Sequence, residues 1–381
     1  MLHRGSVGLK CSWVLLAGLY ACSDSADGGG GFDRNMRPLG AAGIGAPTGG
    51  GGTGTGIGGF GDGPTVPGTG GTTQPPLFDP TMCTNVTLNA TRVTPTVMLV
   101  VDGSQSMVTN MYGAGTRWDA IRNALIDPAM GVVPALQDLV KFGLAVYGTM
   151  PTCPLPLNVV MPALANAAAV TTGLPAQPPG MFTPTGRALS DVVDMLPDPV
   201  TGDPDVMIEP QIIVLATDGD PNDCNLDPFA GGGMANYQPS IDAAMKLQAK
   251  HQKMYVISVG MDAAVTHLQE MANIGAGMPR EMTPGAPVFY PEDPTQLAAT
   301  LKQLVGEEIS CVVTLEGQGV IVGKECGGTV TLNGTPLQCN GDNGWRLNDS
   351  LHIELLGEPC EQFKMSASAQ LIANFPCDAV E

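Results

Sequence analysis

Basic residues are scarce in this sequence. Lys and Arg number 17 against 36 Asp and Glu, which gives a net charge of −19, and no basic cluster occurs. Because nucleic-acid binding needs a positive surface opposite the phosphates, this composition argues against a nucleic-acid partner. Long apolar runs are also lacking, since none reaches the roughly 18 residues of a membrane-spanning helix. A multi-pass membrane protein is therefore excluded.

Large apolar residues are sparse between Ser23 and Pro80, where 20 of the 51 glycines lie. Such a stretch cannot bury enough surface to offset the entropy cost of ordering. We therefore expect residues 22–82 to be a disordered Gly/Thr/Pro-rich tether, spanning roughly 40–45 Å r.m.s.. The rest of the chain has ordinary apolar content and can form a sizeable core.

The first 21 residues have the features of an export signal. Arg4 and Lys10 form a positive region, and the apolar segment Cys11–Tyr20 is too short to cross a bilayer. The segment Leu19–Cys22 resembles a bacterial lipobox, which implies cleavage before Cys22 and lipidation of its thiol. We expect a lipid-anchored protein of the cell envelope, with Ser23 favouring the outer membrane. The alternative is ordinary cleavage and secretion.

Three near-continuous apolar runs mark the centre of the chain: Val97–Val101, Ile212–Ala216 and Met254–Val259. Such runs are typical of parallel strands covered on both faces. Further strands are predicted at Phe142–Tyr147, Leu157–Met161 and Val288–Tyr290. Helical spacing recurs between them, including Trp118, Ile121 and Leu125, and a closing helix follows at Thr295–Glu308. Residues 91–310 are therefore predicted to form a Rossmann-like α/β domain, an open, mostly parallel six-stranded sheet with helices on both faces.

Residues 311–381 follow a different pattern. Asn333-Gly334 stands between two short β-type segments, which is a strong hairpin signal. Five cysteines fall in this stretch. We predict a small disulfide-stapled β domain.

Eight cysteines remain apart from Cys11 and Cys22. An even number in an exported protein indicates up to four disulfides, and the lack of CxxC spacing disfavours a zinc or redox site. Sequence alone does not fix the pairing. Because two cysteines follow strand ends at one edge of the predicted sheet and two lie at the opposite end, we predict Cys153–Cys224 and Cys83–Cys311.

Three short motifs carry the functional signal. Asp102-Gly103-Ser104-Gln105-Ser106 follows the first predicted strand, Phe182–Leu189 places a threonine before a helix, and Ala216–Gly219 ends another strand with Thr-Asp-Gly. In this order, they resemble the metal-ion-dependent adhesion site of the von Willebrand factor A family. The resemblance covers about Thr91–Ser310.

The motifs place oxygen ligands at the carboxyl ends of strands, where open α/β sheets bind ligands. The candidate metal ligands are Asp102, Ser104, Ser106, Thr183 and Asp218, with Thr185 as the alternative threonine. Two carboxylates and three hydroxyls suit Mg²⁺, or else Mn²⁺ or Ca²⁺. The resemblance implies that the hydroxyls approach the metal while the carboxylates act largely through water or orient hydroxyls. Alternatively, these side chains only cap loops, or the metal only orders them.

A metal with few carboxylate ligands keeps an open position, so the resemblance implies a protein partner that offers an exposed Asp or Glu. We expect contact with the membrane through the lipid anchor alone. No catalytic residue and no organic cofactor site is predicted, since the chain lacks a G-x-S-x-G elbow. A structural or assembly subunit and a metal-assisted hydrolase remain as alternatives. The scattered histidines His251, His267 and His352 are expected to face solvent or be satisfied locally.

Overall fold

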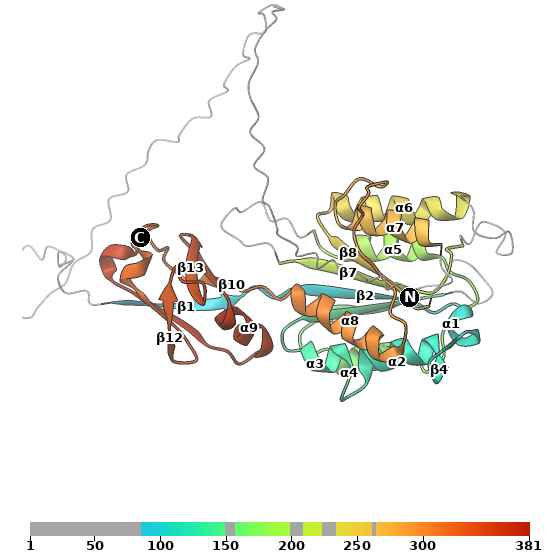
Figure 1. Ribbon diagram of the computed structural model, residues 1–381, viewed down its shortest axis with the longest axis horizontal. Coiled ribbons are helices and arrows are strands. Elements are labelled where there is room, and N and C mark those ends of the chain that lie inside the picture. Colours follow the sequence, from blue (N-terminus) through green and yellow to red (C-terminus); the bar gives the residue numbers. More distant parts are fainter. Residues whose placement is uncertain (1–84, 149–156, 199–208, 223–233, 261–263) are drawn as a thin grey trace, which may run out of the picture. The chain divides into compact units, whose positions relative to one another are not determined.

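The computed structural model describes residues 85–148, 157–198, 209–222, 234–260 and 264–381. They form an α/β sheet domain and a closed β-barrel (Figure 1). Within these ranges, no helix is both long enough and apolar enough to cross a membrane. Cys22, the predicted tether and the predicted pair Cys153–Cys224 lie outside the described residues.

The sheet has six strands in the order β6-β5-β2-β7-β8-β9. All neighbours are parallel except β6, which is antiparallel to β5. This confirms the six-stranded, mostly parallel sheet predicted from the apolar runs. The bounds are β2 (Thr96–Asp102), β5 (Lys141–Tyr147), β6 (Asn158–Ala163), β7 (Gln211–Thr217), β8 (Lys253–Ser258) and β9 (Val288–Phe289).

Helices cover both faces of the sheet (Figure 1). On one face, Val97, Leu99 and Val101 of β2 pack in a core with α2, α3, α4 and α8; on the other, Met98 and Val100 share a core with α5, α6 and α7. Because both faces of β2 and β7 are buried, their sequences do not alternate. The helices are α2 (Arg117–Ile126), α3 (Val132–Leu136), α4 (Ala167–Gly173), α5 (Thr185–Met195), α6 (Met234–Ala249), α7 (Val265–Gly275) and α8 (Pro294–Glu307).

Short elements follow β2 before the first long helix. They are α1 (Ser106–Thr109) and the hairpin of β3 (Met111–Tyr112) and β4 (Gly115–Thr116). The Thr116 hydroxyl then accepts a hydrogen bond from the Asp119 amide, while the Asp119 carboxylate accepts one from the Thr116 amide. This capping box fixes the start of α2, so Arg117 is its first residue.

The barrel closes in the order β1-β10-β14-β13-β12-β11-β15. Asn333 and Gly334 connect β11 and β12 with φ of 51° and 80°, as the hairpin signal predicts. Trp345 and Phe375 are fully buried in its core. Its elements are β1 (Val86–Arg92), β10 (Val312–Leu315), β11 (Thr329–Leu332), β12 (Thr335–Cys339), β13 (Gly344–Asp349), β14 (His352–Leu355), α9 (Glu358–Met365), β15 (Leu371–Phe375) and the 3₁₀ turns Glu325–Gly327 and Cys377–Ala379.

One barrel strand comes from before the sheet domain. β1 pairs antiparallel with β10 and with β15, although β2 to α8 separate it from both in sequence. The sheet domain is thus an insertion between two neighbouring barrel strands. The sequence pattern assigned no element to residues 86–90, because a half-exposed strand of polar and apolar residues is a weak signal without its partners.

Two disulfides join cysteines that both lie in the described part of the barrel, as its cysteine content predicted. Cys311 bonds Cys360, and Cys326 bonds Cys339; Cys377 is disulfide-bonded as well. The prediction of Cys83–Cys311 is therefore wrong. Cys311 directly precedes β10, and α9 brings Cys360 to a Cα–Cα distance of 5.3 Å from it. That contact depends on the tertiary placement of α9, which sequence spacing does not reveal.

His267 on α7 is not exposed, contrary to the expectation for the scattered histidines. It is 2% exposed and stacks on Tyr237 at a ring-centroid distance of 4.3 Å, and neither ring nitrogen has a hydrogen-bond partner among the described residues. Burial lowers its pKa to about 4, although the carboxylates of Glu270 and Asp220 act in the opposite direction.

This burial predicts an acid-dependent loss of stability. Between the unfolded pKa near 6.5 and the folded value of about 4, the unfolded chain binds more protons, so the free energy of unfolding falls as pH falls. The comparison is with His267→Phe, which retains an aromatic ring beside Tyr237. Relative to this variant, the free energy of unfolding of the wild type should fall by about 3 kcal/mol between pH 7 and 4. Denaturant unfolding across this pH range measures the difference. Parallel pH profiles for both proteins would contradict it.

Candidate metal centre

The carboxyl ends of three parallel strands meet at one edge of the sheet. β2 ends at Asp102, β5 at Tyr147 and β7 at Thr217. The Gly103 amide donates to the Tyr147 carbonyl at 2.6 Å. A Cβ at Gly103 would lie 2.4 Å from Pro179 Cδ and 2.8 Å from that carbonyl. Only a glycine therefore lets the end of β2 approach the end of β5 and the segment around Pro179 this closely.

Asp102 is fully buried and held by both carboxylate oxygens. Its Oδ1 accepts from the Ser104 amide at 2.8 Å, and its Oδ2 accepts from Thr217 Oγ1 at 2.6 Å. Both donors belong to the motifs identified in the sequence, Ser104 in the loop after β2 and Thr217 at the end of β7. The carboxylate thereby fixes the backbone of Ser104 and links β2 to β7.

Ser104, Ser106 and Asp218 form a continuous hydrogen-bonded chain with Arg117. The two serine Oγ atoms lie 3.0 Å apart, and Ser106 Oγ donates to Asp218 Oδ1 at 2.7 Å. Asp218 Oδ2 accepts from Arg117 Nη1 at 2.8 Å, a buried ion pair. Four of the five residues predicted from sequence, Asp102, Ser104, Ser106 and Asp218, thus lie in one contiguous cluster. The motifs did not indicate Arg117, which donates to Asp218 at the end of this cluster.

The fifth predicted residue, Thr183, lies on a loop tied to both neighbouring loops. Its amide donates to Asn222 Oδ1 at 2.6 Å, and its carbonyl accepts from the Asn222 amide at 2.9 Å, beyond β7. Earlier on the same loop, the Gly180 amide donates to the Gly103 carbonyl at 3.0 Å. Thr183 itself is 5% exposed.

The alternative threonine, Thr185, is occupied elsewhere. Its hydroxyl lies 3.1 Å from the Tyr147 hydroxyl in a buried contact, and burial raises the pKa of Tyr147 well above its usual value. This contact favours Thr183 as the ligand.

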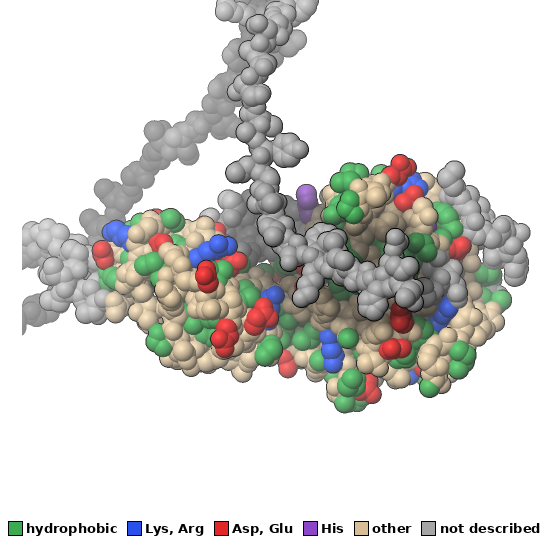
Figure 2. All heavy atoms as spheres, viewed as in Figure 1, with side chains coloured by type: hydrophobic (Ala, Val, Ile, Leu, Met, Phe, Trp, Pro, Cys, Tyr) green, Lys and Arg blue, Asp and Glu red, His purple; other side chains and the backbone are tan. Residues whose placement is uncertain are grey.

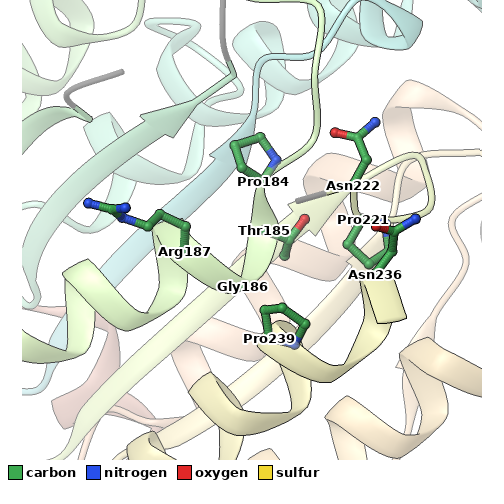
Figure 3. A pocket seen from close by; sticks show the side chains of 8 residues that line it. All are labelled: Pro184, Thr185, Gly186, Arg187, Pro221, Asn222, Asn236 and Pro239. Atoms are coloured by element: carbon green, nitrogen blue, oxygen red, sulfur yellow. The ribbon is translucent and has the colours of Figure 1, made fainter. Parts of the chain in front are cut away.

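A small cavity of about 10 Å³ lies beside this loop (Figure 3). A space of this size suits one water molecule and gives no support to binding of an organic ligand. Its lining comes from the start of α5, the loop after β7 and α6: Pro184, Thr185, Gly186, Arg187, Pro221, Asn222, Asn236 and Pro239.

A family model for the von Willebrand factor type A domain matches residues 96–303, more than half of the chain. The chain belongs to this family. The vWA match spans β2 to α8 and so includes every strand of the sheet. None of the curated proteins matches.

Several solved structures are similar to this chain at low identity. The pilus adhesin SpaC from Lactobacillus rhamnosus GG is 14% identical, with 76% of this chain and 40% of SpaC covered and a TM-score of 0.43. Manganese-loaded TRAP from Plasmodium vivax is 16% identical over 72% of this chain and 97% of TRAP, with a TM-score of 0.39.

Proximal thread matrix protein 1 from the mussel byssus, with a zinc-occupied MIDAS motif, is 16% identical over 59% of this chain and 50% of its own, with a TM-score of 0.38. This chain thus spans less than two thirds of the SpaC and mussel chains.

Electrostatics at the vWA strand ends favour a bound cation. Burial, together with the nearby charge of Asp218, raises the pKa of Asp102 to about 7, although hydrogen bonds from Thr217 and Ser104 act in the opposite direction. Burial also raises the pKa of Asp218, although hydrogen bonds from Arg117 and Ser106 counteract the increase. Two carboxylates in a shared buried site are unfavourable as a doubly charged pair, and a divalent cation would offset that cost.

The donor set of the vWA site fits such an ion. Every candidate ligand atom is an oxygen, as Mg²⁺ and Mn²⁺ prefer. Metal–oxygen distances near 2.1 Å place adjacent octahedral oxygens about 3.0 Å apart, and the hydroxyls of Ser104 and Ser106 have a 3.0 Å separation. Among the described residues, no group of three His, Cys, Asp or Glu side chains is placed to hold a metal.

Proposed function

We propose that this vWA protein binds a protein partner through a divalent cation held at the carboxyl ends of β2 and β7. The observation that supports it most is the hydrogen-bonded chain Ser104–Ser106–Asp218, with Asp102 buried beside it. In that chain the carboxylates are engaged by protein donors, which leaves neutral hydroxyls as the groups that face an ion. Mg²⁺ is the expected metal, with Mn²⁺ or Ca²⁺ as substitutes.

Each residue has a distinct part in this proposal. Ser104, Ser106 and Thr183 present hydroxyl oxygens, while Asp102 orients the Ser104 backbone and Asp218 orients the Ser106 hydroxyl. When bound, the cation supplies a Lewis-acidic centre with an open position for a carboxylate of the partner. The protein itself supplies the fixed geometry, because the loops are held to one another before any ligand arrives.

We propose a binding role rather than an enzymatic one. The hydroxyls of Ser104 and Ser106 bond each other and Asp218, and no histidine among the described residues hydrogen-bonds either of them. A serine nucleophile needs an adjacent base, so this arrangement gives little support to a hydrolase. A structural subunit, in which the ion only orders the loops, would bind metal in the same way.

Partner capture separates these roles. The protein is immobilised and exposed to matched cell extracts in Mg²⁺ or in EDTA, at low and physiological NaCl. The partner should no longer be captured in EDTA, nor by the double variant Ser104→Ala/Ser106→Ala. The control is Ser366→Ala/Ser368→Ala, which removes another pair of serine hydroxyls, 3.1 Å apart, and should leave capture unchanged.

Salt should have little effect on that capture. The chain carries a net charge of −19, and the described face in Figure 2 intersperses acidic and basic side chains. The negatively charged protein therefore repels an acidic partner at long range rather than attracting it. At physiological salt the Debye length is only about 8 Å, so this repulsion is largely screened. Capture that resists EDTA but falls steeply with NaCl would overturn the proposal and indicate another binding surface.

We further propose that Cys22 is lipidated and tethers the protein to the cell envelope, with the outer membrane as destination. The support is the lipobox-like Leu19–Cys22 and the Gly-rich stretch after it. Wild-type protein expressed in a bacterial host should partition into the detergent phase, and Cys22→Ser should move to the aqueous phase. Equal partitioning of both would leave secretion as the better explanation.

A further inference from the structure

The connections around the candidate metal centre carry exposed apolar side chains. Met111 is 67% exposed, Met181 41% and Val265 58%. They lie on three different connections: the β3–β4 hairpin after β2, the segment before α5 and the start of α7 after β8. We call these three residues the apolar rim. Single exposed apolar residues are common on protein surfaces, so it is the placement of these three around one site that indicates a binding surface.

Met111 is held outward beside the candidate ligand Ser106. The Asn110 amide donates to the Ser106 carbonyl at 3.1 Å, and the Tyr112 hydroxyl donates to the Pro291 carbonyl at 2.5 Å, just after β9. Tyr112 is buried by this contact. Because neighbouring side chains of a strand point to opposite sides, burial of Tyr112 turns Met111 toward solvent.

Met181 lies between two anchored residues. The amide of the preceding Gly180 donates to the Gly103 carbonyl at 3.0 Å, within the first motif. Two residues after Met181 comes the candidate ligand Thr183. Gly180 and Thr183 are both buried while Met181 is exposed, so the fixed backbone places the methionine at the surface beside the site.

Val265 is joined to the site through the residue before it. The Ala264 amide donates to Asp220 Oδ1 at 2.8 Å, and Asp220 follows the candidate ligand Asp218 by two residues. The other oxygen of Asp220 accepts from the Tyr237 hydroxyl at 3.3 Å. Both oxygens of this carboxylate therefore bond within the protein, and the loop after β7 is tied to the start of α7.

Charge is nearly absent from these connections. Residues 103–116 and 174–184 contain no Asp, Glu, Lys, Arg or His, although 14% of the whole chain is charged. Among residues 219–222 and 264–266, which the structure also describes, Asp220 is the one charged residue. A chain with a net charge of −19 thus surrounds its candidate metal centre with a nearly uncharged, partly apolar surface. Such a surface complements an apolar partner, because it leaves no unpaired charge to be buried in the contact.

We propose that the apolar rim binds apolar side chains on either side of the acidic residue that the metal-loaded site takes. The partner segment is then an Asp or Glu flanked by large apolar residues. This inference rests on the proposed function and adds which acidic segments the site selects: the ion takes the carboxylate and the apolar rim takes its neighbours. Methionine suits this part, since its unbranched, flexible side chain adapts to apolar groups of different shape.

Two heptapeptides of equal charge test the proposal. Each is acetylated and amidated and has a central glutamate, flanked on both sides by leucine in one peptide and by serine in the other, with glycines at the ends. Steady-state surface plasmon resonance measures their binding to the immobilised full chain in Mn²⁺ and in EDTA. In Mn²⁺ the leucine peptide should bind about tenfold more tightly, because each leucine is partly buried against the apolar rim. Neither peptide should bind in EDTA.

The double variant Met111→Gln/Met181→Gln should lose this preference. Glutamine keeps the length of methionine and adds no charge, so affinity for the leucine peptide should fall to that for the serine peptide. Mn²⁺ affinity, followed by electron paramagnetic resonance of free Mn²⁺, should stay unchanged. The matched control is Met130→Gln/Met245→Gln, which replaces two methionines of 55% and 54% exposure outside these connections and should keep the tenfold preference.

Equal affinity of the wild type for the two peptides in Mn²⁺ would overturn the inference while leaving the proposed function in place. So would a preference for leucine that persists in EDTA or in Met111→Gln/Met181→Gln. If the wild type binds no Mn²⁺, or binds neither peptide when loaded with Mn²⁺, the proposed function fails and this inference fails with it.

Discussion

Replacing Asp102 with alanine should abolish divalent-metal binding. The fully buried carboxylate accepts from the Ser104 amide and from Thr217, so its loss frees the loop that carries both serine ligands and removes one of the two negative charges near the ion. Loss of a group that orients the metal ligands typically lowers metal affinity by about 10–100-fold, and the lost charge adds to that. Calorimetric titration with Mg²⁺ or Mn²⁺ should show about one site in the wild type and none in Asp102→Ala.

Asp138→Ala is the matched control. Asp138 is an exposed aspartate in the same domain, between α3 and β5, and lies outside the three motifs. The Asp138→Ala variant should bind metal like the wild type. Unchanged stoichiometry and affinity in Asp102→Ala would show that the ion binds elsewhere.

Removing the disulfide Cys311–Cys360 should destabilise the barrel more than removing Cys326–Cys339. The first closes a loop of 49 residues and the second a loop of 13. In the chain-entropy model these loops correspond to about 4 and about 3 kcal/mol of unfolding free energy. The first also fastens α9 to the start of β10, where the barrel chain leaves the sheet domain.

Denaturant unfolding of the two Cys→Ala double variants measures this difference. Trp345, buried in the barrel, reports on barrel unfolding once Trp13 and Trp118 are replaced by phenylalanine. A larger loss for the Cys326/Cys339 variant would contradict the prediction, and native-state strain would then outweigh loop length.

The sheet could be predicted from sequence because its signals are local. Fully buried parallel strands give uninterrupted apolar runs such as Ile212–Ala216, and these runs stand directly before the motif residues. The loops therefore had to meet at one edge of the sheet. The same reasoning extended to the hairpin at Asn333-Gly334, whose turn chemistry needs no tertiary information.

Other features depend on contacts that no local pattern encodes. Arg117 occupies an ordinary first position of an amphipathic helix, and only the three-dimensional structure places it against Asp218. β1 becomes a strand because β10 and β15 flank it, and Cys311 finds Cys360 through α9. His267 shows the same limit, since its α7 position does not reveal the Tyr237 ring that covers it.

The position of the metal tests the central claim most directly. Crystals of the protein grown or soaked in MnCl₂ would be measured at a wavelength where manganese scatters anomalously. We predict a single anomalous peak at the carboxyl ends of β2 and β7, about 2–2.5 Å from the Oγ atoms of Ser104 and Ser106, and no such peak in Asp102→Ala crystals. A wild-type map with no peak at these serines, or with manganese bound only to exposed carboxylates elsewhere, would contradict the account.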